Sequence, residues 1–150
     1  TLAIGVDVSG STSYYMDGFM SQIQGLVEQC NIEKVKVCWC STIVHHDEEG
    51  NYWDEVDISI YNDFDSYIDA TPNVSRYFFT TSAKQDHADI SYPSGSHLIF
   101  GSETHGLSDG ILERFPDQSL NIPIQLGLVR SLNLANAASI ALYTALRNRI

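Results

Sequence analysis

The amino-acid sequence predicts an α/β fold, in which a mostly parallel sheet is flanked by helices. Three observations support this prediction. The chain opens with the order strand, helix, strand, which is typical of parallel sheets. No apolar run approaches the ~20 residues that a membrane-spanning helix needs. The length of 150 residues suits a single domain, which we expect over residues 1–150.

The first half is predicted to contain three strands and two helices. Residues 2–8 form an apolar run that ends in a polar turn, as a buried strand does. A helix of about four turns follows, because apolar residues recur at steps of three and four; they are Met16, Met20, Ile23, Leu26, Val27 and Cys30. Strands are predicted over 35–40 and 56–60, and a short helix over 63–70.

The second half is predicted to contain strands over 76–80, 97–100 and 121–124. A short helix is expected over 109–115, and a final helix over 132–149. The final helix carries an apolar stripe wide enough for both the core and a second copy of the chain; it consists of Leu134, Ala138, Ala141, Leu142 and Ala145. We therefore expect a homodimer.

Charge and cysteine content narrow the choice of partners and compartment. The chain has 8 Lys and Arg residues against 19 Asp and Glu residues, for a net charge of −11. Such a chain repels polyanions, so tRNA binding is disfavoured unless a local basic patch exists. Its 3 cysteines provide no disulfide framework, and its first residues form a strand rather than a signal peptide. We expect a cytoplasmic protein without a membrane segment.

A candidate metal site lies where the first strand ends. Asp7, Ser9 and Ser11 supply a carboxylate and two hydroxyls, which suit a hard ion such as Mg2+. Capping of the following helix by these side chains is the alternative. Segment 2–46 resembles the first strand, helix and strand of von Willebrand factor A domains, whose motif is DxSxS. The resemblance implies a site completed by a distant Thr and Asp, for which the rest of the chain offers no convincing match.

Two later loops have the pattern of a ligand site. Gly101 and Gly106 lie five apart after a strand, and glycines let the backbone approach a ligand closely. A strand that includes Ile122 leads into another glycine-containing loop, after which Ser131 or Asn133 opens the final helix. Either residue can cap that helix, or the helix amides can meet a ligand. On these residues alone, a nucleotide-like site and ordinary helix capping both remain open.

The same loops carry a specific resemblance. FGSETHGL (100–107) and IPIQLGLVRSLNLANAASIALYTALR (122–147) resemble the last two motifs of SPOUT (TrmH-type) RNA methyltransferases, most closely those of the TrmL/YibK type. The resemblance implies a C-terminal trefoil knot, S-adenosylmethionine bound in the knot, and methylation of the 2′-hydroxyl of the tRNA wobble nucleotide. It implies cofactor contacts at Phe79, Gly101, Ile122 and Ser131, with Glu103, Gly106, Leu132 and Asn133 shaping the site.

The N-terminal part departs from this family. The TrmL/YibK type begins with a segment whose Arg helps to activate the ribose hydroxyl, whereas residues 7–29 contain no Arg. We interpret the chain as an engineered chimera, with a von Willebrand factor A-like segment over 1–50 and a SPOUT-derived segment over 51–150. We favour a domain that binds S-adenosylmethionine without efficient tRNA methylation. A divalent-metal-binding module, a chimera without function and an active tRNA methyltransferase are the alternatives.

Overall fold

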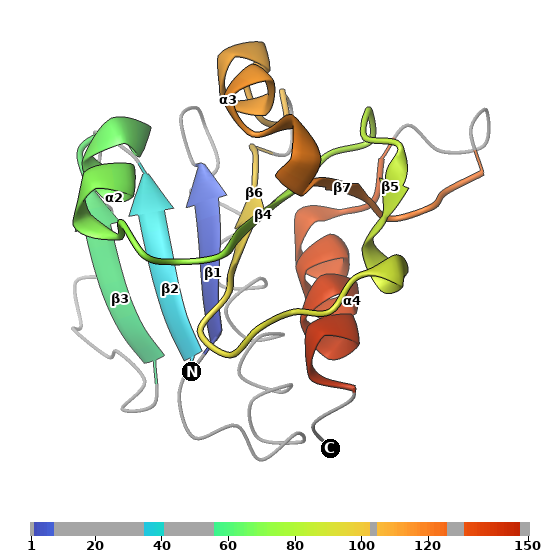
Figure 1. The fold of residues 1–150 in the computed structure, drawn as a ribbon, viewed down its shortest axis with the longest axis horizontal. Helices are drawn as coiled ribbons and strands as arrows, with labels where there is room; N and C mark the ends of the chain where they lie inside the picture. Colours follow the sequence, from blue (N-terminus) through green and yellow to red (C-terminus); the bar gives the residue numbers. More distant parts are fainter. Residues whose placement is uncertain (1, 8–34, 41–55, 103–104, 126–130, 148–150) are drawn as a thin grey trace.

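The structure is a computed structural model that describes residues 2–7, 35–40, 56–102, 105–125 and 131–147. Seven strands from these residues form one sheet in the order β3-β2-β1-β6-β4-β7-β5 (Figure 1). Each pairing between these neighbouring strands is parallel. The predicted α/β fold with a mostly parallel sheet is therefore confirmed.

The first strand of the chain lies inside the sheet. β1 pairs with β2 on one side and with β6 on the other, so that Val6 stands beside both Trp39 and Phe100. The N-terminal and C-terminal halves of the chain thus share one sheet. The strands are β1 (Leu2–Asp7), β2 (Val35–Cys40), β3 (Val56–Tyr61), β4 (Arg76–Phe79), β5 (Gln85–Asp86), β6 (His97–Phe100) and β7 (Ser119–Asn121).

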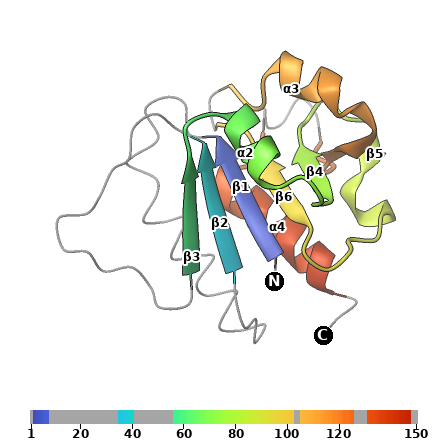
Figure 2. The same ribbon diagram turned by 60° about the vertical axis from the view of Figure 1, so that its left-hand side comes forward.

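Helices cover both faces of the sheet, with α2 and α4 on opposite sides (Figure 2). Strand side chains alternate between faces. Phe78 and Ile99 therefore pack with α2 and α3, whereas Phe79 and Phe100 pack with α4. The helices are α2 (Phe64–Ala70), α3 (Asp109–Arg114) and α4 (Leu134–Leu146), with the short 3-10 helices η2 (His87–Asp89) and η3 (Pro116–Gln118).

Several predicted elements differ from the structure by one residue at an end, and two differ by more. The strand predicted over 121–124 lies instead at Ser119–Asn121. It ends before Pro123, whose nitrogen carries no hydrogen to donate to a neighbouring strand. The final helix begins at Leu134 rather than at residue 132, because Asn133 caps it. β5, η2 and η3 were not predicted.

The apolar stripe of the final helix lies in the core. Its members Ala138, Ala141, Leu142 and Ala145 are buried, and Leu134 packs against the same cluster. Among the described residues, the exposed large apolar side chains are instead Ile140 and Tyr143, also on α4. The stripe therefore gives no separate support to the homodimer, which stays a prediction.

Some predictions concern residues that the structure does not describe. The helix over 16–30 lies outside the described residues, as do 103–104 and 126–130 in the two loops that imply the knot. The knot therefore stays a prediction. None of the helices in the described part of the chain is long and apolar enough to cross a membrane.

Candidate functional site

The candidate site lies at the carboxyl ends of three neighbouring strands. β6, β4 and β7 are adjacent and parallel, with Phe79 beside Phe100 on one side and beside Leu120 on the other. Gly101 and Ile122 follow these strands and therefore leave the sheet at the same edge. α4 runs back from this edge along the sheet (Figure 1). Ligands of α/β proteins commonly bind at this edge.

Gly101 is buried and has no room for a side chain. The loop after β6 folds back, so that a Cβ atom at Gly101 would lie 1.9 Å from the carbonyl carbon of Gly106 and 2.1 Å from the amide nitrogen of Leu107. Gly106 donates its N–H to the carbonyl oxygen of Ser102 at 2.8 Å. Its φ of +71° lies in the region that favours glycine. Both glycines therefore shape the loop itself, whatever ligand it meets.

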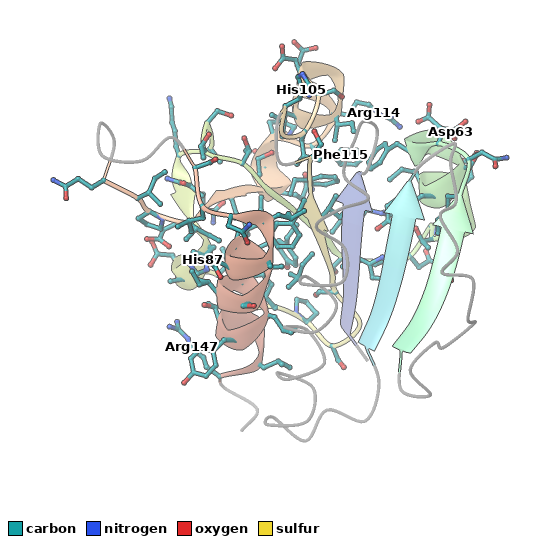
Figure 3. The ribbon with its side chains drawn as sticks, turned by 180° about the vertical axis from the view of Figure 1, so that it is seen from behind. Asp63, His87, His105, Arg114, Phe115 and Arg147 are labelled. Carbon is teal, nitrogen blue, oxygen red and sulfur yellow. The ribbon has the colours of Figure 1, made fainter. Side chains whose placement is uncertain are left out.

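The Ser102 hydroxyl also organises this loop, a role that sequence analysis did not assign. Ser102 is buried, and its Oγ accepts a hydrogen bond from the backbone N–H of His105 at 3.2 Å. The exposed His105 lies beside α3 (Figure 3). A serine three residues before a His-Gly pair was the available signal, because Ser hydroxyls often bond nearby backbone groups in turns.

Asn133 fixes the start of α4. Its side-chain oxygen accepts hydrogen bonds from the backbone N–H groups of Ala135 and Asn136, at 3.0 and 3.4 Å. Asn133 rather than Ser131 is therefore the N-cap, which decides between the two residues that the sequence left open. Just before the cap, Leu132 is half-buried and Ser131 is exposed. Both residues lie at the end of the sheet from which α4 begins.

Phe79 packs in the core rather than facing an open site. It is 8% exposed, and its ring stacks on that of Phe100 with the centroids 4.7 Å apart. A ligand at the strand end would therefore meet the backbone of Phe79 rather than its ring. Ile122 is half-buried against the same cluster.

A buried histidine lies on the α4 side of the sheet. His87 is 6% exposed, and its Nδ1 has no hydrogen-bond partner among the described residues. Its ring centroid lies 6.3 Å from that of Phe79, and Tyr92 donates its hydroxyl to the His87 carbonyl oxygen at 2.8 Å. Burial lowers the pKa of His87; Asp86 opposes this shift, and Arg147 adds to it. Nothing in the sequence indicates that His87 is buried, because it is a single histidine in a polar stretch.

The structure brings most of the predicted cofactor residues to one edge. Phe79, Gly101 and Ile122 follow or end adjacent strands, and Gly106 belongs to the loop that folds over Gly101. Ser131, Leu132 and Asn133 stand at the beginning of α4, which starts from the same edge (Figure 1). Glu103 lies outside the described residues.

The predicted metal site receives no support. Asp7 ends β1, whereas Ser9 and Ser11 lie outside the described residues. Within the described ranges, no three His, Cys, Asp or Glu side chains are grouped so that they could hold a metal ion.

Comparison with protein families matches residues 28–143 to the SpoU rRNA Methylase family. A tRNA (cytidine(34)-2'-O)-methyltransferase of Burkholderia ambifaria is 35% identical over 100 residues, which are 65% of this chain and 64% of that protein. The enzyme of that name from Escherichia coli (strain K12) is 33% identical over 98 residues, or 65% of this chain and 62% of that protein. The matched part thus spans less than two-thirds of these relatives.

Solved structures share the fold over nearly the whole chain. A structure described by the words "Structural insights into the 2-OH methylation of C/U34 on tRNA" has a TM-score of 0.78 at 23% identity, covering 99% of this chain and 90% of that one. An AdoMet-bound rRNA methyltransferase from Sinorhizobium meliloti has a TM-score of 0.69 at 19% identity, covering 99% of this chain and 57% of that one.

These findings confirm the resemblance of the later segments to SPOUT methyltransferases, but they give no support to a chimeric or engineered origin. The family match begins at residue 28, inside the segment 1–50 that we expected to be von Willebrand factor A-like. The two solved structures also align with residues on both sides of the expected junction, since each covers 99% of the chain.

Proposed function

Because the chain belongs to the SpoU rRNA methylase family, we propose that it is a tRNA 2′-O-methyltransferase that uses S-adenosylmethionine. One observation carries the proposal: the loops that resemble the SPOUT motifs leave β6 and β7 at the edge where β4 also ends. The choice of nucleotide 34 as the target rests on the names of the relatives alone.

The residues at this edge suit a nucleoside cofactor. Small-molecule sites combine apolar walls with a few polar groups. Half-buried Ile122 and Leu132 are apolar, exposed Ser131 offers a hydroxyl, and the loop at Gly101 offers backbone groups. We assign cofactor contacts to Phe79, Gly101, Ile122, Ser131 and Leu132, with Gly106 and Asn133 setting the loop and the helix that frame them.

Methyl transfer needs a positioned hydroxyl and an acceptor for its proton. Bound S-adenosylmethionine supplies a methyl group on a sulfonium centre. The cofactor would give up this methyl group, with breakage of its carbon–sulfur bond, to the ribose oxygen, whose proton would pass to a base of the protein or solvent. Residues 7–29 contain no Arg, so in this chain another group must assist that step.

An S-adenosylmethionine-binding domain without efficient transfer is the second candidate. It is favoured by the missing Arg and by the net charge of −11, which repels tRNA phosphates. The comparisons favour the active enzyme instead, because relatives at about one-third identity are named tRNA methyltransferases. In both cases we propose that residues 1–150 act as one domain, since β1 lies between β2 and β6 in one sheet.

Two measurements separate these candidates. Calorimetry with S-adenosylmethionine tests binding, and transfer of labelled methyl to tRNA tests the reaction. A tRNA with a 2′-deoxyribose at position 34 is the matched control for the target. We expect binding, together with transfer that the deoxy tRNA abolishes. The second candidate would be favoured if the chain binds the cofactor but transfers methyl about 10²–10⁴-fold more slowly than the Escherichia coli enzyme. Such a reduction is the usual cost of losing a general base. No binding would overturn both.

A further inference from the structure

We propose that Arg114 is a positioning residue for the described end of the loop after β6, residues 105–107, on which it acts by attaching α3 to α2. This inference rests on the proposed function, in which that loop borders the cofactor. Arg114 lies at the last position of α3, and its side chain reaches α2 rather than the loop itself. Its effect on the loop therefore passes through the helix.

α3 depends on contacts with other elements for its position. It has 6 residues, too few for a helix that is stable on its own. Its N-cap, Ser108, makes no side-chain capping bond, and none of its residues is fully buried. Leu107 ends the loop two residues before α3 begins at Asp109. A shift of α3 would therefore move the end of the loop.

Arg114 joins α3 to α2 by one ion pair and two ring contacts. Its Nη1 lies 2.6 Å from Oδ1 of Asp65, in the first turn of α2. Its guanidinium carbon lies 5.7 Å from the ring centroid of Phe64, on α2, and 5.6 Å from that of Phe115, which follows α3. Figure 3 shows Arg114 close to Phe115 and, in this view, between His105 and Asp63. An exposed ion pair alone stabilises a protein little. The two contacts between the planar guanidinium and the rings therefore matter for this attachment, because they add attraction and depend on the orientation of the group.

The rings beneath Arg114 connect it with the sheet and with the loop. Phe115 stacks on Phe78 of β4 with centroids 4.7 Å apart and planes at 17°. Phe64 contacts both of these rings, at 6.1 and 6.2 Å. Leu107, the last residue of the loop, is buried in the same cluster. Arg114 thus covers a ring stack to which the end of the loop is also attached.

The test follows the Gly106 amide, which is bonded to Ser102 within the loop. We expect Arg114→Ala to accelerate hydrogen exchange of this amide about three- to tenfold, and to raise the Kd for S-adenosylmethionine by a similar factor. Exchange in α4 should stay unchanged. Arg114→Lys should give an exchange rate and a Kd between those of the unaltered protein and Arg114→Ala, because it keeps the charge but loses the planar group. Glu113→Ala is the matched control, since Glu113 is the exposed neighbour on the same helix.

The outcomes distinguish this inference from the proposed function. Exchange at Gly106 that is no faster in Arg114→Ala than in Glu113→Ala overturns the inference. Faster exchange with no cofactor binding by the unaltered protein supports the loop's dependence on Arg114 and overturns the proposed function. If Arg114→Ala does not fold, Asp65→Ala and Arg114→Lys provide the test, because each removes only part of the contact.

Discussion

The two faces of the sheet are packed by different means. On the α4 face, the helix presents Ala138 and Ala141 to the sheet, and neither has any exposed surface. On the other face, α3 buries no residue completely, and aromatic rings such as Phe64 and Phe115 fill the space between the helices and the sheet. Small side chains let a helix backbone lie close to the strands, whereas large rings hold a helix further away.

This difference predicts different tolerance to mutation. A closely packed face has no room for added atoms, and interiors at native packing density resist even small increases in volume. Half-buried rings at the rim of the other face can move toward solvent. Substitutions that add volume should therefore cost more beneath α4 than beneath α3.

The largest effect is expected at a position on the α3 side of the chain that nevertheless has no room for added atoms. Gly101 leads toward α3, yet a Cβ atom there would lie 1.9 Å from the backbone of Gly106. We expect Gly101→Ala to lower the free energy of unfolding by about 3 kcal/mol or more, because neither backbone segment can move aside cheaply. Chemical denaturation measures the change. In Gly110→Ala, the control, a Cβ atom meets nothing within 4 Å. The control should be neutral or stabilising by up to about 1 kcal/mol. Equal effects would contradict the prediction.

Added volume tests the two faces directly. Ala138→Leu, on the buried side of α4, should lower the free energy of unfolding by about 2 kcal/mol, since three extra carbon atoms have no space there. Ile111→Phe adds the same number of carbon atoms to half-buried Ile111 in α3. It should cost less than about 1 kcal/mol, because that side chain can turn outward. Thermal and denaturant unfolding of both variants give the comparison, and a larger loss for Ile111→Phe would reverse our view of the two faces.

Helix capping sharpens the contrast further. Asn133 caps α4 through its side chain, whereas Ser108, at the same position of α3, forms no such bond. Asn133→Ala should therefore destabilise the protein by about 1 kcal/mol, and Asn133→Asp should retain most of the stability. Ser108→Ala is the matched control and should change the free energy of unfolding little. A Ser108→Ala effect as large as that of Asn133→Ala would show that the two helix starts do not differ.

The smallest effect concerns pH and the α4 face. Burial lowers the pKa of His87 below that of the unfolded chain, about 6.5. Between the two values the unfolded chain binds more protons, so stability falls as pH decreases through about 6.5 toward the lower, folded pKa. His87→Phe should flatten this part of the stability profile. Denaturation midpoints of the unaltered protein and of His87→Phe between pH 5 and 8 measure both slopes, and an unaltered slope in His87→Phe would contradict the assignment.

Much of the sheet could be predicted because its strands are apolar runs of ordinary length. Val35–Cys40 and His97–Phe100 are such runs, and the structure has them as predicted. β5 consists of Gln85 and Asp86 alone, and two polar residues carry no periodicity. The last strand was predicted too late in the chain because Ile122 and Ile124 are both apolar, whereas β7 contains a single apolar residue, Leu120.

The glycines of the candidate site could be predicted from the sequence, whereas the side chains that hold its loop in place were not predicted. Gly101 and Gly106 stand out in sequence, because glycine has no Cβ atom to obstruct a close approach and adopts a positive φ at no steric cost. Ser102 bonds a backbone group only three residues away, a local signal that the sequence analysis missed, whereas Arg114 contacts Asp65, which is 49 residues away in the chain. An ion pair between residues so far apart in the chain leaves no pattern in a single sequence.

The place of β1 inside the sheet has a consequence for synthesis. β1 comprises the first residues described, yet one of its two neighbours is formed by residues 97–100. Until the ribosome has released that segment, β1 has an edge that its own sheet does not yet cover. Such an edge is a template for pairing with other chains, and contacts between distant residues also form slowly. The growing chain is therefore most exposed to misassembly before β6 emerges, and translation speed between β3 and β6 should influence the yield of folded protein.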